Sequence, residues 1–131
     1  MDNTMALLLS DTYKQCHDRM YPNGLTKLVS YWVPRKSMLE NQNEMVFFGL
    51  QAFIKEYLMG YFQKNFFDLS EDEMLTLYTD SMDVQIGRDN YDLDKIVELH
   101  RLGYLPLEIR ALPEGTLVPM GVPCIEITNT D

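Results

Sequence analysis

The sequence has few of the residues that build metal centres or reactive thiol sites. Its 131 residues include two cysteines and two histidines, and the cysteines form no CxxC pair. We therefore expect no zinc site made from this chain alone. Cys16 and Cys124 lie far apart, and the N-terminal stretch does not resemble a secretion signal. These features predict two free thiols and a cytoplasmic protein.

Long apolar runs and an excess of positive charge are also absent. No apolar stretch approaches the ~20 residues that span a bilayer, and the formal charge is −9. Proteins that bind nucleic acid usually carry a basic surface. The composition therefore argues against membrane insertion and nucleic-acid binding. It does not exclude a small phosphate-bearing ligand, because a few well-placed arginines are enough to bind one.

The motifs of several common enzyme classes are missing. Neither GxGxxG nor GxxxxGK[ST] occurs, and neither does GxSxG or HExxH. Cys16 and His17 are adjacent, but neighbours on a helix point about 100° apart and do not form a nucleophile–base pair. The residues alone therefore assemble no catalytic site. The chain is either a binding or structural module, or part of a larger enzyme.

The length predicts a single domain over residues 1–131. Residues 7–24, "LLLSDTYKQCHDRMYPNG", predict a short helix with Ser10 or Asp11 as its N-cap. A strand follows over 25–33 and ends at Pro34. One stripe of the first helix combines four residues at helical spacing: Tyr13, Cys16, His17 and Met20.

Three further helices and a final set of strands complete the predicted α+β fold. Residues 44–67 show a strong helical pattern, and we expect this aromatic-rich helix to form core or dimer surface. A capping box, Ser70 with Glu73, predicts the start of the next helix. Residues 89–106 predict another, with its core side at Leu93, Ile96, Val97 and Leu99 and its C-cap at Gly103. From Leu105 the pattern predicts a short antiparallel meander or half-barrel.

Three stretches in order resemble the N-terminal portion of the nicotinamide phosphoribosyltransferases. They read "LLLSDTYKQCHDRMYPNGLTKLVSYWVPR", "EMVFFGLQAFIKEYL" and "LPLEIRALPEGTLVPMGVPCIEITNTD". The resemblance runs from about residue 7 to 131 and is weakest over 62–92. Two departures are Thr12, where the family has serine, and Pro34 before the arginine at position 35.

The resemblance implies a longer enzyme whose catalytic barrel is missing from this chain. Family members join nicotinamide to 5-phosphoribosyl 1-pyrophosphate, which gives nicotinamide mononucleotide for NAD biosynthesis. Mg²⁺ and ATP take part in the full-length enzyme. The family works as a homodimer in which the N-terminal portion of one subunit completes the site of the other. The resemblance thus implies no catalytic residue in this chain, and no activity from the chain alone.

Three residues here match pocket residues of the family. Tyr13 corresponds to the tyrosine that stacks on nicotinamide, whereas its place on the stripe would otherwise suggest core packing. Asp11 is expected either to accept from the ligand amide or to cap a helix. Arg35 corresponds to an arginine that contacts phosphate groups in the partner's site, or it is a solvated surface residue.

Two alternatives remain at this point. The chain could be a non-enzymatic interaction or regulatory module, or one half of a split enzyme. Within the enzyme class, the acid nicotinate is an alternative substrate to nicotinamide.

Overall fold

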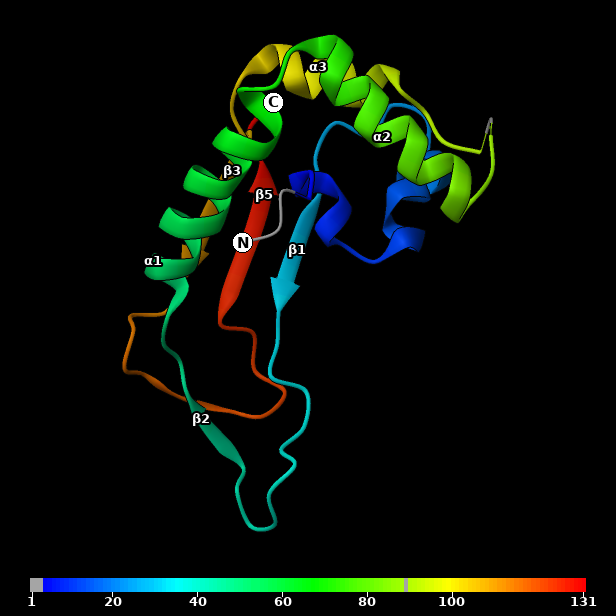
Figure 1. The fold of residues 1–131 in the computed structure, drawn as a ribbon. Helices are drawn as coiled ribbons and strands as arrows, with labels where there is room; N and C mark the ends of the chain where they lie inside the picture. The colour runs from blue at the N-terminus through cyan, green and yellow to red at the C-terminus, as the bar shows by residue number, and fades with distance from the viewer. Residues whose placement is uncertain (1–3, 89) are drawn as a thin grey trace. The chain divides into compact units, whose positions relative to one another are not determined.

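The computed structural model describes residues 4–88 and 90–131, and at Asp18 the backbone only. These residues form two compact units. The helical unit contains the segment up to Asn23 and Phe53–Leu105, and the sheet unit contains Gly24–Ala52 and Pro106–Asp131. Helices together with small antiparallel sheets confirm the predicted α+β class (Figure 1).

The first helix is more tightly wound and more broken than the sequence predicts. Two 3₁₀ helices, η1 (Ala6–Leu9) and η2 (Thr12–Met20), replace a single capped helix. Ser10 lies between them in extended conformation, and its Oγ donates to the carbonyl of Leu7 at 3.3 Å. Ser10 therefore ends η1, and Asp11, the other predicted N-cap, is the residue that directly precedes η2. A serine hydroxyl can bond the preceding backbone as readily as the following one, so spacing alone does not decide.

The predicted long helix begins later than its apolar pattern suggests. Glu44–Val46 forms strand β2, and the helical path starts at α1 (Leu50–Phe53). Gly49, at φ +95°, turns the chain between them. The helix then continues as two wide π-helical segments, η3 (Ile54–Tyr61) and η4 (Gln63–Phe67). The prediction of helix at 44–49 is wrong because Met45 and Val46 find partners on a distant strand, which local periodicity cannot reveal.

Helices α2 (Glu71–Gln85) and α3 (Asp94–Leu102) confirm the local signals of the sequence. The Ser70 hydroxyl accepts from the Glu73 N–H, and the Glu73 carboxylate accepts from the Ser70 N–H. Gly103 follows α3 in the left-handed region at φ +78°. Asp89, where the sequence pattern of the second helix begins, lies outside the described residues.

One face of α2 forms the centre of the helical unit's core. Met74, Tyr78 and Met82 recur every four residues and are fully buried. Phe66 from η4 packs with them, as do Met5 and Ala6. The predicted core side of α3 is confirmed, because four of its residues pack against this cluster: Leu93, Ile96, Val97 and Leu99.

The sheet unit contains two small antiparallel sheets. In the first, β5 (Ile125–Asn129) lies between β1 (Val29–Trp32) and β3 (Leu107–Ala111), as Figure 1 shows. In the second, β2 pairs with β4 (Leu117–Pro119). In a simple meander the last three strands would pair in consecutive order. Here β4 pairs with β2, and β3 pairs with β5, so the predicted meander is not formed. A small core of Phe47, Val118 and Cys124 lies in this unit.

No helix in the described part of the chain is long and apolar enough to cross a membrane. The two cysteines are free thiols, as the sequence predicts.

Candidate functional site

At the start of η2, Lys14 lies against both pocket residues predicted near the N-terminus, Asp11 and Tyr13. The Lys14 N–H donates to the Asp11 carbonyl at 2.9 Å, and the Lys14 ammonium lies 3.1 Å from the Asp11 carboxylate. The side-chain hydrogen bond from Lys14 to the Asp11 carboxylate, together with the charge of that carboxylate, raises the pKa of Lys14. Both side chains are exposed, and an exposed ion pair of this kind contributes little free energy. The Asp11 carboxylate can therefore exchange Lys14 for another donor, such as an amide N–H₂ group.

Tyr13 lies at the surface of the helical unit, outside both buried clusters. It is 62% exposed, and Met20 on the same predicted stripe is 76% exposed. The core interpretation of this stripe is therefore wrong for the described chain. The Tyr13 ring contacts the His17 ring at 5.3 Å between centroids, and the Lys14 amine lies 5.8 Å from its centroid. Tyr13 thus presents a flat aromatic surface that is free to stack on another ring.

Cys16 and His17 are used for packing and take different partners. The Cys16 Sγ donates to the Asn90 carbonyl at 3.6 Å, while the His17 ring contacts Tyr13. The second thiol, Cys124, is buried, and burial raises its pKa. A raised pKa keeps a thiol protonated and unreactive. These contacts agree with the sequence argument against a nucleophile–base pair.

Arg35 belongs to the sheet unit, so it is described separately from Asp11 and Tyr13. It follows β1 and is exposed. Its neighbour Pro34 is buried, and the Pro34 carbonyl accepts from the Gly121 N–H at 2.7 Å. The proline therefore anchors the backbone just before the arginine. Within residues 4–88 and 90–131, no carboxylate forms an ion pair with Arg35, so its guanidinium is available to an anion.

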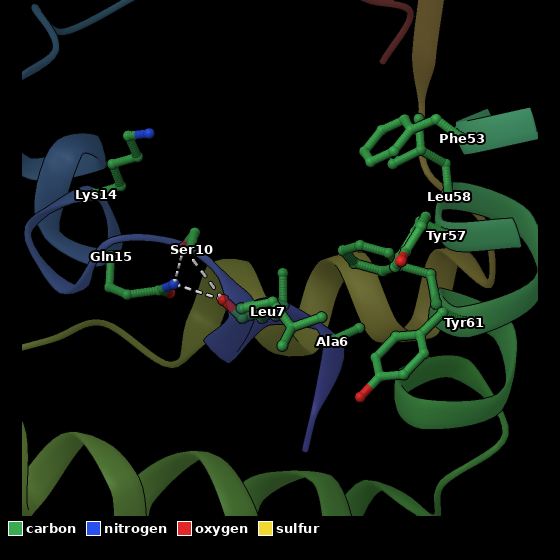
Figure 2. Close-up of a pocket in the computed structure, with 11 residues that line it drawn as sticks. Ala6, Leu7, Ser10, Lys14, Gln15, Phe53, Tyr57, Leu58 and Tyr61 are labelled. Atoms are coloured by element: carbon green, nitrogen blue, oxygen red, sulfur yellow. Dashed lines mark hydrogen bonds between the residues drawn. The ribbon is translucent and has the colours of Figure 1, made fainter. Parts of the chain in front are cut away.

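A groove of 540 Å³ lies in the helical unit beside the start of η2. Figure 2 shows that the rings of Phe53, Tyr57 and Tyr61 line one side and face the segment containing Ala6 and Leu7. Neighbouring rings in this row lie 5.2 and 6.4 Å apart between centroids. The spacing of four residues is visible in the sequence, but the packing of η1 opposite the row is not.

The polar end of the groove mainly holds the backbone in place. The Gln15 amide donates to the Leu7 carbonyl and to the Ser10 hydroxyl, both at 2.7 Å (Figure 2). The Gln15 Oε1 also accepts from the Tyr78 hydroxyl at 3.2 Å, which ties η2 to α2. Lys14 lines the groove and Tyr13 does not. The groove therefore offers an apolar packing surface and no pair of groups suited to acid–base chemistry.

The described chain offers no metal centre of its own. Nowhere in the parts that the structure covers do three or more histidine, cysteine, aspartate or glutamate side chains gather closely enough to hold a metal ion. What the chain does offer is an exposed aromatic ring, an exposed carboxylate beside it and an unpaired guanidinium. These are binding groups and not a complete catalytic set.

Comparisons with known proteins identify the family of this chain. The family model described as "Nicotinamide phosphoribosyltransferase, N-terminal domain" matches residues 5–109, which include the stretch where the resemblance is weakest. A nicotinamide phosphoribosyltransferase of Acinetobacter baylyi is 39% identical over 92% of this chain. Another, of Xanthomonas campestris pv. campestris, is 32% identical over the whole chain.

In both comparisons the match covers 25% of the relative. The chain thus spans about a quarter of the length of the curated relatives that it matches. The chain belongs to the nicotinamide phosphoribosyltransferase family and corresponds to the N-terminal portion of its members.

Proposed function

We propose that this chain is the N-terminal portion of an enzyme that transfers a 5-phosphoribosyl group from 5-phosphoribosyl 1-pyrophosphate to nicotinamide. The products are nicotinamide mononucleotide and pyrophosphate, and the role is NAD biosynthesis. The observation that carries the proposal is the exposed Tyr13 ring beside Asp11, on a chain whose described residues gather no catalytic set. Such a surface needs a second wall to become a pocket.

Tyr13 supports the choice of a flat ring as ligand. Nicotinamide is a planar, electron-poor pyridine amide, and it suits offset stacking on the electron-rich phenol of a tyrosine. The Asp11 carboxylate, two residues earlier, is an acceptor for the N–H₂ group of the amide. An acid in place of the amide would bring a second negative charge close to Asp11. The proposed contact with Asp11 is therefore better suited to nicotinamide than to nicotinate.

Arg35 supports the choice of a phosphate-bearing second substrate. A guanidinium matches the oxygens of a phosphate group with two parallel hydrogen bonds, and Arg35 has no competing carboxylate among the described residues. In this proposal Arg35 contacts phosphate in the site of the neighbouring subunit of a homodimer. The contribution of this chain is positioning and charge stabilisation, which a phosphoribosyl transfer needs more than a covalent nucleophile.

The remaining components belong to the whole protein in this proposal. Mg²⁺ assists the departure of pyrophosphate when it is bound, and ATP acts on the full-length enzyme. The 131-residue chain alone forms no nicotinamide mononucleotide. Two free thiols are in keeping with a reducing cytoplasm as the place of action.

The reading frame after codon 131 is the first experiment. We expect it to continue in frame and to encode the other three quarters of a protein like the two relatives. A natural stop codon at this point would contradict the proposal of one long enzyme. It would favour one half of a split enzyme if a neighbouring gene encoded the rest. Without such a gene, it would favour a regulatory module.

A competition assay tests the choice of substrate. The whole protein is given equal concentrations of nicotinamide and nicotinate, and the two mononucleotide products are separated by mass. We expect the amide product to dominate. A dominant acid product would contradict the assignment of Asp11 to the amide group.

A further inference from the structure

The His17 ring contacts the Tyr13 ring on the same helix. Its ring lies 5.3 Å from the Tyr13 ring between centroids, with 54° between the planes. Within residues 4–88 and 90–131 it forms no hydrogen bond and no ion pair. Aromatic pairs are favourable at centroid distances of about 4.5–7 Å. The contact with Tyr13 is therefore the specific interaction of this half-buried imidazole among the described residues.

The two rings differ in exposure, so the less exposed ring can restrict the motion of the more exposed one. Tyr13 is largely exposed, whereas His17 is half-buried on the same 3₁₀ helix. An exposed tyrosine samples several rotamers, and a ligand that stacks on it has to restrict the side chain to one. A neighbouring ring that favours one rotamer in advance lowers this entropic cost. His17 is placed to act in this way, because it lies four residues after Tyr13 on η2 and contacts its ring.

We propose that His17 is a positioning residue that holds the Tyr13 ring ready to stack on nicotinamide. This inference rests on the proposed function of Tyr13. His17 acts through the tyrosine, without touching the substrate, and its imidazole transfers no proton. Lys14 also lies against the Tyr13 ring, but its amine is exposed and paired with Asp11, so it can move away when a ligand arrives.

Steady-state kinetics of the whole protein test the proposal with three variants. H17A removes the ring contact, and we expect the KM for nicotinamide to rise by about 2- to 12-fold, the range that corresponds to one aromatic pair. The kcat should stay within about twofold of the wild-type value, because a preorganised ring mainly affects ligand binding. H17F keeps an aromatic ring and should restore most of the loss. C16A alters the neighbouring residue on the same helix and should leave the KM unchanged.

Two results would overturn the role of His17. One is an unchanged KM in H17A while Y13A raises it, which leaves the proposed function intact and removes only this inference. The other is equal impairment in H17F and H17A, which would point to a role for the imidazole itself. If Y13A leaves the KM unchanged as well, the stacking role of Tyr13 fails, and that outcome is distinct from both.

Nuclear magnetic resonance of the 131-residue chain tests the contact without any activity. Selective labelling of tyrosine and histidine should give a cross-peak between the Tyr13 and His17 rings. The order parameter of the Tyr13 side chain should be lower in H17A than in the wild-type chain, and unchanged in C16A. Absence of the cross-peak, or equal ring order in the wild-type chain and H17A, would overturn the inference even if the whole protein were inactive.

Discussion

Replacing Tyr13 with alanine separates a binding role from a packing role, because the two predict opposite results. Tyr13 is 62% exposed and lies outside both buried clusters. Surface substitutions of this kind usually change the free energy of unfolding by less than about 0.5 kcal/mol. We therefore expect the Y13A chain to unfold at nearly the same urea concentration as the wild-type chain.

The expected loss in ligand binding follows from the exposed area of the ring. Full burial of a tyrosine removes about 150–250 Å² from water, and covering one face of a ring that is 62% exposed removes roughly 45–75 Å². This area contributes about 1–2 kcal/mol at about 25 cal/mol per Å². Stacking geometry adds about 0.5–1.5 kcal/mol. The KM for nicotinamide in the whole protein should then rise roughly 10- to 400-fold.

The assay measures KM for nicotinamide at saturating 5-phosphoribosyl 1-pyrophosphate, with urea unfolding of the 131-residue chain in parallel. Y13F serves as the matched control, since it keeps the stacking ring and should stay within about threefold of the wild-type KM. A loss of more than about 2 kcal/mol in unfolding free energy, with KM unchanged, would refute the reasoning. That pattern is the one expected of a buried core residue.

Three further predictions concern the other unit, the core and pH. R35A should raise the KM for 5-phosphoribosyl 1-pyrophosphate roughly tenfold or more, and R35K should not restore it because lysine lacks the two-pronged geometry; a fully restored KM in R35K would argue against this contact. F66A should lose about 3–5 kcal/mol of unfolding free energy, because Phe66 is fully buried against other rings, whereas a loss below about 1 kcal/mol would contradict its place in the core. The hydrogen bonds and charge of Arg101 hold the pKa of Glu71 below its ordinary value of 4.5, so its contribution to stability is present above that pH and is lost as the pH falls through the lowered pKa. Urea unfolding of E71Q should accordingly lose this part of the acid dependence, and an unchanged profile would refute the assignment.

Local signals in the sequence predicted the parts of the fold that depend on local chemistry. The capping box at Ser70 and the left-handed glycine at Gly103 each act within a few residues, and both are confirmed. The pairing of β2 with β4 depends on residues about 70 positions apart, and the periodicity of the aromatic-rich segment concealed it. For the same reason the order β1-β5-β3 could not be predicted, because β1 lies about 100 residues before its partner β5.

The family motifs propose the residues of the candidate site but do not predict their exposure or contacts. Family motifs identified Asp11, Tyr13 and Arg35, but the exposure of Tyr13 depends on what packs around η2. The predicted stripe placed Tyr13 and His17 on the same side of a helix, and their rings are in contact, although the segment is a 3₁₀ helix. Asp11 and Tyr13 lie in the helical unit, and Arg35 lies in the sheet unit. Local sequence patterns therefore do not predict whether these three residues share one pocket.

Product formation tests the central claim most directly. The whole protein and the 131-residue chain are incubated separately with nicotinamide, 5-phosphoribosyl 1-pyrophosphate, Mg²⁺ and ATP, and nicotinamide mononucleotide is measured by mass. We predict product from the whole protein and none from the 131-residue chain. Product from the short chain, or a whole protein that forms none under these conditions, would contradict the claim that this chain is the binding portion of a larger nicotinamide phosphoribosyltransferase.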